Sequence, residues 1–391
     1  MTDNYDVAVI GSGPGGYVCA IRAAQLGLSV ICIDKRGSHG GTCLNVGCIP
    51  SKALLHASEL FIEKNKFSSM GIEAENISLN LESMMSYKDN GVNGNVKGID
   101  FLFNKNKIDA VHGEAKILGS TKIAIALNDG TNKEIEAKNI VIATGSVPTS
   151  IPGAEISGDK IISSTEALSL DEVPNKLVVV GGGYIGLELG SVWSRLGSEV
   201  TVVEYLNRIT PGMDNEVSSA FQKILAKQGL NFLLNSQVIS VTEDGSNASV
   251  VMKNRESNEE EVIKADYVLI STGRKPYLEN LFSDGLDIQK TDTGFIKTDS
   301  HLRTSIDGVW AIGDVVEGPM LAHKAEEEGI AVAELIAGKP GHVNYDIIPS
   351  VIYTNPEVAS VGMTEEQLKE KSIEYSIGKF PFLANGRAKV N

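Results

Sequence analysis

Short apolar runs that end at glycine-rich turns organise the beginning of the chain. Residues 6–10 form a β-rich apolar run, and the glycines of residues 11–16, GSGPGG, follow before a helical stretch. A second apolar run, residues 29–33, ends at Asp34. Such glycines let the backbone approach a pyrophosphate at a helix N-terminus, and an acid after the second strand can bond a ribose hydroxyl. The pattern therefore predicts a dinucleotide-binding unit.

The same pattern returns at a fixed offset of 170 residues. An apolar run precedes Gly181, Gly183 and Gly186, which repeat the first set of glycines. Glu204 then stands where Asp34 stands in the first unit. The alternative for each unit is a glycine-rich turn that binds nothing. Agreement over strand, turn, helix and acid instead favours two dinucleotide-binding domains.

The remaining stretches predict the elements between and after these units. Residues 65–96 are predicted to be helical with polar interruptions, and residues 108–127 alternate apolar and polar side chains as strands do, before a hairpin turn at residues 128–130. Residues 236–251 are also predicted to be β. Near the end, Thr364 has the sequence of a capped helix start. Two buried-type strands, residues 139–143 and 267–271, end in Ala-Thr-Gly and Thr-Gly-Arg, and both turns look like crossings back into a nucleotide site.

Composition narrows the class of protein. The chain has 391 residues and a formal net charge of −15, which argues against nucleic acid and anionic membranes as partners. No stretch approaches the ~18 consecutive apolar residues of a membrane span. The N-terminus reaches a strand within a few residues and carries acids where a targeting peptide would carry bases. We expect a cytoplasmic protein, or one of the mitochondrial matrix if a transit peptide was removed.

Candidate chemistry gathers in residues 40–52, GGTCLNVGCIPSK, where Cys43 and Cys48 stand with four residues between them. We expect both in the opening turn of a helix, with Pro50 near its first position, where a missing N–H is harmless. A helix N-terminus stabilises anions and so favours the thiolate, the reactive form of cysteine. A disulfide across so short a loop constrains the unfolded chain little. These features favour a redox-active pair.

Three other interpretations of the pair explain less. A structural disulfide is disfavoured because nothing points to an oxidising compartment. A zinc site is disfavoured because only His39 is close by, while Cys19 and Cys32 lie in other elements; we predict no metal site. Two ordinary buried cysteines would leave the glycine-rich approach and the helix start unexplained.

The stretch GGTCLNVGCIPSK closely resembles the active-site signature of the flavin-dependent pyridine nucleotide-disulfide oxidoreductases, and within them the dihydrolipoamide dehydrogenase branch. Further matches follow along nearly the whole chain. The resemblance implies an α/β fold with two Rossmann-like domains of the disulfide oxidoreductase type, one for FAD and one for NAD, plus the start of an α+β dimerisation domain. The implied domains are FAD-binding (1–147), NAD-binding (148–275), a central domain completing the FAD site (276–345) and the start of an incomplete dimerisation domain (346–391).

This resemblance implies FAD-dependent oxidation of protein-bound dihydrolipoamide, with reduction of NAD⁺, as the dehydrogenase component of 2-oxo acid dehydrogenase and glycine cleavage complexes. Cys43 would exchange with the substrate dithiol and Cys48 would lie against the flavin. Lys52 would place a positive charge near the flavin, and Glu188 would pair with Lys52 and touch the nicotinamide. The implied partners are lipoyl domains, the acyltransferase core and a second subunit of a homodimer in the full-length protein. The alternatives are a related NAD(P)H-dependent disulfide reductase and a non-catalytic flavin-binding subunit or fragment.

The same resemblance assigns cofactor contacts along the chain. A carboxylate at Glu204 would accept the ribose hydroxyls of NAD and repel the 2′-phosphate of NADP. The implied FAD residues are Gly11, Gly13, Gly16, Asp34, Lys35, Gly41, Thr42, Lys52, Ala115, Thr144, Gly145, Ser146, Asp314, Met320, Leu321, Ala322 and His323. The implied NAD residues are Gly181, Gly183, Tyr184, Ile185, Gly186, Glu188, Glu204, Val238 and Gly273.

One departure concerns acid–base chemistry. The family carries a His in a His-Pro…Glu segment near its C-terminus, which reaches across the dimer as acid and base for the dithiol. None of the six histidines here has that context, and His323 matches instead the start of the helix expected to face the flavin. The chain stops at Asn391 in mid-domain. We therefore expect a C-terminally truncated member that has the flavin, dithiol and nicotinamide parts but not this base.

Overall fold

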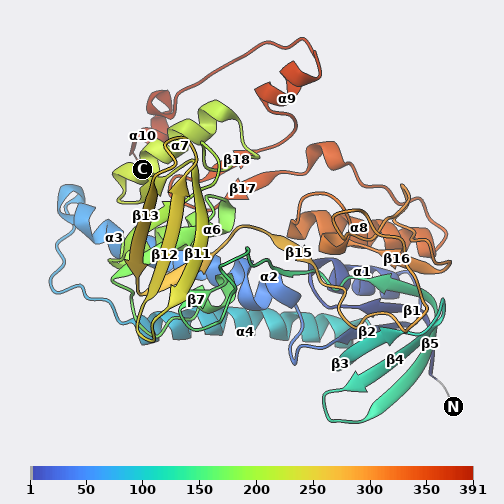
Figure 1. The fold of residues 1–391 in the computed structure, drawn as a ribbon. Coiled ribbons are helices and arrows are strands. Elements are labelled where there is room, and N and C mark those ends of the chain that lie inside the picture. The colour runs from blue at the N-terminus through green and yellow to red at the C-terminus, as the bar shows by residue number, and fades with distance from the viewer. Residues whose placement is uncertain (1–2, 391) are drawn as a thin grey trace.

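Two sheets, each built on one glycine-turn unit, lie in the two lobes seen in Figure 1. The computed structural model describes residues 3–390. The first sheet contains β1 (Asp3–Ile10), β2 (Val30–Asp34), β3 (Asp109–Ile117), β4 (Lys122–Leu127), β5 (Asn132–Ile142) and β16 (Val309–Ala311). Strand β1 pairs in parallel with β2 and β5, which continue in parallel to β3 and β16. Strand β4 pairs antiparallel with both β3 and β5. A strand from the last quarter of the chain thus completes the first sheet.

The second sheet is parallel throughout, in the order β10-β9-β8-β14-β7. Its strands are β7 (Ile161–Ile162), β8 (Lys176–Val180), β9 (Glu199–Val203), β10 (Asn231–Leu233) and β14 (Tyr267–Ile270). A separate antiparallel sheet, β11 (Ser236–Glu243), β12 (Ala248–Asn254) and β13 (Glu260–Ala265), packs on it through a shared apolar cluster. The predicted α/β fold with two Rossmann-like units is confirmed.

Helices follow the glycine turns as the pattern predicts. Helix α1 (Pro14–Gln25) begins after the first turn and α6 (Tyr184–Leu196) after the second. Helix α8 (Ala322–Ile336) packs against α1. The shorter helices of the second lobe are α5 (Ser164–Ala167) and α7 (Asn215–Lys227).

The chain crosses between the lobes on two paired strands. Strand β6 (Ser146–Pro148) leaves the first sheet and β15 (Arg274–Pro276) returns from the second. The two strands pair antiparallel, with Arg274 opposite Pro148. The crossings predicted after Ala-Thr-Gly and Thr-Gly-Arg are therefore confirmed, and they lie side by side.

Helix α4 (Leu81–Lys105) extends along both lobes (Figure 1). Its C-terminal half buries Ile99 and Phe103 in the core of the first lobe, while Met84 and Met85 pack on the core of the second. The Lys88 ammonium donates to the carbonyl of Leu168 at 2.8 Å, next to α5. Helix α4 thus ties the two nucleotide-binding sheets together.

Two predicted elements are interrupted. The helix expected over residues 65–96 is a 3-10 helix, η1 (Lys64–Met70), a non-helical stretch and then α4. Gly71, at φ +74°, ends the first part, and the Asn80 side chain caps α4 by accepting from the Ser83 N–H. The β stretch expected over residues 236–251 breaks between β11 and β12 at Gly245, φ +90°.

The last segment lies against the second lobe. It contains β17 (Ser350–Ile352), β18 (Val358–Ser360), α9 (Glu365–Glu370) and α10 (Gly386–Val390), with short 3-10 turns η2 (Gly313–Val315), η3 (Tyr345–Ile347) and η4 (Phe382–Ala384) before and within it. Ile352 and Val358 are buried in the apolar cluster of the second lobe. The predicted cap of α9 is confirmed, since Thr364 and Gln367 form a capping box.

Candidate active site

Cys43 and Cys48 form a disulfide, with 4.7 Å between their Cα atoms. The sequence predicted both cysteines in the opening turn of one helix, and this prediction is wrong. Cys43 lies in α2 (Gly41–Val46), and Cys48 is the first residue of α3 (Cys48–Glu63), with Pro50 two positions further on. The helices separate at Gly47, whose φ and ψ of −146° and −108° are not helical. This break brings the two sulfur atoms together.

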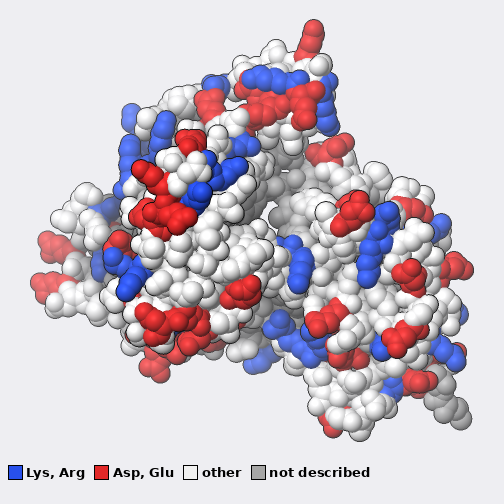
Figure 2. Space-filling model, in the orientation of Figure 1, with Lys and Arg blue, Asp and Glu red and all other residues white. Residues whose placement is uncertain are grey.

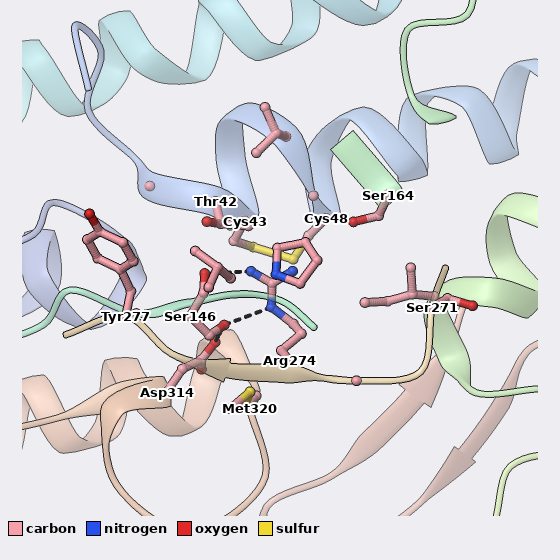
Figure 3. A pocket seen from close by; sticks show the side chains of 18 of the residues that line it. Thr42, Cys43, Cys48, Ser146, Ser164, Ser271, Arg274, Tyr277, Asp314 and Met320 are labelled. Carbon is pink, nitrogen blue, oxygen red and sulfur yellow. Dashed lines mark hydrogen bonds between the residues drawn. A yellow bond between two sulfur atoms is a disulfide. The ribbon is translucent and has the colours of Figure 1, made fainter. Parts of the chain in front are cut away.

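The disulfide faces a cavity of about 1760 Å³ that reaches both glycine turns. Pockets for single small ligands are typically ~300–1000 Å³, so this one has room for more than one. Figure 3 shows the two cysteines, Ser146, Arg274 and Asp314 among the residues that line this pocket. In Figure 2 a hollow opens between the two lobes, with Lys and Arg side chains at its edge. The cavity lining itself holds Lys35, Arg36, Lys52 and Arg274 together with carboxylates such as Asp34 and Glu204.

The lining includes all the predicted site residues except two glycines. Gly16 and Gly186, the third glycine of each turn, lie outside it. A Cβ on Gly16 would overlap the carbonyl oxygen of Gly11, and one on Gly186 would overlap that of Gly181. Both glycines therefore let a helix pack against its strand, and their contact with the cofactors stays a prediction.

The structure fits two dinucleotides at the helix N-termini. Helices α1 and α6 begin after Gly13 and Gly183, which both line the cavity, and neither helix start has a side-chain cap that would occupy its free N–H groups. Gly41, at φ +59°, lies so near the first turn that a Cβ there would be 2.5 Å from the Cα of Gly13. A larger residue at this position would narrow the cavity in front of the N-terminus of α1.

The acid of each unit holds its own glycine turn. Asp34 accepts from the Ser12 N–H at 2.7 Å and from the Ser12 hydroxyl at 2.6 Å. Glu204 accepts from the Gly182 N–H at 2.6 Å and from the Leu206 N–H at 2.8 Å. Both acids also line the cavity. A carboxylate has about four lone-pair sites, so these bonds leave capacity for ribose hydroxyls.

Lys52 and Glu188 both line the cavity and lie 2.9 Å apart, which confirms their predicted pairing. The Glu188 side chain is 8% exposed and accepts also from the Ser51 hydroxyl at 3.2 Å and the Tyr353 N–H at 3.0 Å. The Lys52 ammonium lies 4.3 Å from the centre of the Tyr353 ring. Sequence reasoning missed Tyr353, which comes from the last segment of the chain.

Arg274 is a second residue that the motifs did not single out. Its guanidinium donates to the Ser146 hydroxyl and to the Ser146 carbonyl, both at 2.7 Å, and the hydroxyl donates to Asp314 at 2.5 Å (Figure 3). Burial lowers the pKa of Arg274, and the nearby Asp314 charge opposes that shift. The Thr-Gly-Arg crossing was the available signal. Tyr277, whose ring lies 3.8 Å from the Lys35 ammonium, also lines the cavity.

His323 lies at the start of α8, as predicted, and its Nε2 is 2.7 Å from the carbonyl oxygen of Pro349. Within residues 3–390 no group of three or more His, Cys, Asp or Glu side chains is placed to hold a metal ion. None of the helices in that range has the length and apolar character of a membrane span.

Two family profiles match most of the chain. The profile of the pyridine nucleotide-disulphide oxidoreductase family matches residues 5–329, and that of the family's dimerisation domain matches residues 348–391. The chain therefore belongs to the pyridine nucleotide-disulphide oxidoreductases, an enzyme family that uses FAD and NAD. Its place in that family is among the dihydrolipoyl dehydrogenases. The branch suggested by GGTCLNVGCIPSK is thus confirmed.

Individual relatives support this placement. Over 390 residues the chain is 51% identical to the mitochondrial dihydrolipoyl dehydrogenase of Pisum sativum, covering 100% of this chain and 78% of that protein. It is 54% identical over 390 residues to dihydrolipoyl dehydrogenase 3 of Pseudomonas putida, covering 99% and 83%. Leghemoglobin reductase of Glycine max is 51% identical over 390 residues, covering 100% and 75%.

The fold has a solved counterpart in LpdA of Mycobacterium tuberculosis. Its crystal structure matches with a TM-score of 0.90 at 24% identity, covering 100% of this chain and 84% of that chain. This likeness supports the fold alone.

Proposed function

We propose that the protein oxidises dihydrolipoamide carried on lipoyl domains and reduces NAD⁺, as the dehydrogenase component of 2-oxo acid dehydrogenase and glycine cleavage complexes. The observation that carries the proposal is the disulfide of Cys43 and Cys48, which borders a cavity with a nucleotide-type helix N-terminus at each end. The names of the relatives from Pisum sativum and Pseudomonas putida support this substrate.

In this proposal Cys43 is the sulfur that exchanges with the substrate. A thiolate of dihydrolipoamide attacks Sγ of Cys43, the bond to Cys48 breaks, and Cys48 leaves as a thiolate. The second substrate thiol loses its proton to solvent and attacks the substrate sulfur of the mixed disulfide; the bond to Cys43 breaks and Cys43 leaves as a thiolate, so lipoamide leaves oxidised and both cysteines are reduced. The position of Cys48 at the start of α3 supports its role, because a helix N-terminus stabilises a thiolate. When bound, FAD supplies a two-electron acceptor between this dithiol and NAD⁺.

The proposed FAD site consists of the first glycine turn, Asp34 and Lys35, residues 144–146, Asp314 and the start of α8. The proposed NAD site includes Gly181, Gly183, Glu204, Val238 and Gly273. Lys52 and Glu188 stand between the two sites. The Lys52 charge stabilises electron density that arrives near it, and Glu188 holds that charge in place. We retain the domain boundaries 1–147, 148–275, 276–345 and 346–391 as part of this proposal.

We also propose a homodimer, supported by the match to the family's dimerisation domain, with lipoyl domains and the acyltransferase core as partners. The proposed compartment is the cytoplasm, with the mitochondrial matrix as the alternative. Relatives from Pisum sativum mitochondria and from Pseudomonas putida support both.

The deciding experiment measures substrate choice with flavin-loaded protein. Rates of NADH formation are compared for a dihydrolipoyl domain, free dihydrolipoamide and reduced glutathione, and in the reverse direction NADH oxidation is compared with lipoamide and with ferric leghemoglobin. We expect the lipoyl substrates to be preferred by at least tenfold in kcat/KM, with loss of that activity in Cys43→Ser. Equal rates with leghemoglobin in Cys43→Ser and the unaltered protein, together with no lipoyl activity, would refute the proposal.

A further inference from the structure

A buried ion pair holds the backbone of Gly313, the residue that precedes Asp314. Lys324 and Glu328, one turn apart on α8, lie 3.0 Å from each other, and their side chains are 1% and 0% exposed. Glu328 accepts from the Gly313 N–H at 2.6 Å. Lys324 donates to the Gly313 carbonyl at 3.1 Å. Both the N–H and the carbonyl of Gly313 are therefore hydrogen-bonded to a charged side chain.

Gly313 is the residue that most needs such support. It lies at φ +75°, between β16 and Asp314, where its backbone has the freedom that only glycine has. Asp314 lines the cavity and receives the Ser146 hydroxyl at 2.5 Å. A rotation of the backbone at Gly313 would turn the Asp314 carboxylate with it.

A third residue completes the arrangement. The Tyr345 hydroxyl donates to Glu328 at 3.0 Å, from the η3 turn that leads into the last segment. Burial first, and the Glu328 charge second, raise the pKa of Tyr345, so the hydroxyl stays a donor. The three side chains join α8, Asp314 and the start of the C-terminal segment.

Stability alone is a poor reason for this pair. Desolvation of two charges roughly cancels their attraction, and apolar residues of similar volume often stabilise a fold as well or better. A buried ion pair is better suited to holding one local geometry. Here every side-chain hydrogen bond of the pair goes to Gly313, to Tyr345 or to the other member of the pair.

We propose that Lys324 and Glu328 are positioning residues that fix the backbone on both sides of Gly313 so that Asp314 is pre-oriented for the flavin, with Tyr345 as the link to the C-terminal segment. The inference rests on the proposed role of Asp314 in binding FAD. Pre-organisation of this kind acts mainly on affinity, because a loosened Asp314 must be ordered again each time FAD binds.

The test uses apoprotein and FAD. The double variant Lys324→Met with Glu328→Leu removes both charges together, so no lone buried charge is left to prevent folding. We expect it to keep the thermal midpoint of the apoprotein within a few degrees, while the Kd for FAD from flavin fluorescence rises about tenfold or more, by analogy with metal sites, where loss of a partner that orients a ligand typically costs about 10–100-fold in affinity. Half-maximal reactivation should need more FAD, with kcat at saturating FAD within twofold. Tyr345→Phe should raise the Kd less, about threefold.

Matched controls exist on the surface. Lys369 and Glu365 form an ion pair at 2.6 Å with the same spacing, and Tyr375 donates to Glu365 at 2.8 Å. Lys369→Met and Tyr375→Phe should leave the Kd for FAD unchanged.

The variant Asp314→Asn distinguishes failure of the positioning role from failure of the flavin contact assigned to Asp314. If Asp314→Asn weakens FAD binding and the folded double variant binds FAD within twofold of the unaltered protein, the positioning role is wrong and the proposed function stands. If Asp314→Asn leaves the Kd unchanged, the assigned flavin contact is wrong, and the inference falls with it.

Discussion

The Lys52 ammonium lies 2.9 Å from the Glu188 carboxylate, although 136 residues separate the two in sequence. Lys52 comes from α3, four residues after Cys48, and Glu188 from α6, behind the second glycine turn. The contact therefore joins the dithiol of one nucleotide-binding unit to the helix of the other. In the proposed function this contact lies between the FAD site and the NAD site.

Lys52→Met should slow reduction of the bound flavin by dihydrolipoamide about 10²-fold, because one preorganised charge typically contributes that much. Anaerobic stopped-flow absorbance measures this step directly. Lys64→Met is the control, since Lys64 directly follows the last residue of the same helix and its ammonium lies over the Phe61 ring, outside the cavity lining. A Lys52 variant as fast as the control would exclude this electrostatic role.

The two cysteines should differ in their spectra. In Cys43→Ser the remaining Cys48 thiolate, at the start of α3, should lie against the oxidised flavin and produce a long-wavelength absorption band. Dithiol exchange should be abolished while flavin stays bound. In Cys48→Ser the band should be absent. Visible spectra of both variants after flavin loading decide the assignment, and a band in Cys48→Ser alone would reverse the two roles.

Glu204→Arg should raise the affinity for NADP relative to NAD. The change replaces repulsion of the 2′-phosphate by a charge-assisted bond of ~1.5–3 kcal/mol, which is roughly a ten- to hundredfold change in the ratio of Kd values. Because Glu204 also accepts from the Gly182 N–H, affinity for both nucleotides should fall in absolute terms. Glu204→Gln, which retains one acceptor, is the matched variant. Titration calorimetry with both nucleotides measures the ratio, and an unchanged ratio would remove Glu204 from the ribose site.

Asp6 should contribute acid-sensitive stability. A hydrogen bond from Lys138, and then bonds from Ser29, lower its pKa from the ordinary 3.8 to about 2. A lowered pKa in the folded state stabilises the protein above the unfolded-state pKa, and that contribution is lost as the pH falls from about 4 to about 2. At pH 7 Asp6→Asn should therefore lower the free energy of unfolding by about 1–2 kcal/mol, allowing for partial solvent screening.

Urea unfolding at pH 7 and at pH 3 tests this, with Asp284→Asn at an exposed site as control. The difference between Asp6→Asn and the unaltered protein should shrink at the lower pH. A difference that grows as the pH falls would contradict the assignment.

Local chemistry made much of the site predictable. The two glycine turns, Asp34 and Glu204, and the cysteine pair each belong to a short stretch with a recognisable spacing. Arg274 could not be found in this way, because its partner Ser146 is 128 residues away and the contact arises only when β6 and β15 pair. The helix break at Gly47 was missed for a related reason: a glycine inside an otherwise helical pattern costs only ~1 kcal/mol, so sequence alone does not tell a break from a tolerated glycine.

Helix α4 has a consequence for any attempt to take this protein apart. Its Ile99 and Phe103 complete one core and its Met84 and Met85 pack on the other, so the spatial units do not follow a single cut in the sequence. A fragment ending at residue 147 would carry the whole helix but leave its first half without a partner surface, and the complementary fragment would expose the groove that this half covers. We therefore expect neither piece to be soluble alone, and co-expression of the two to restore a folded complex held together by α4.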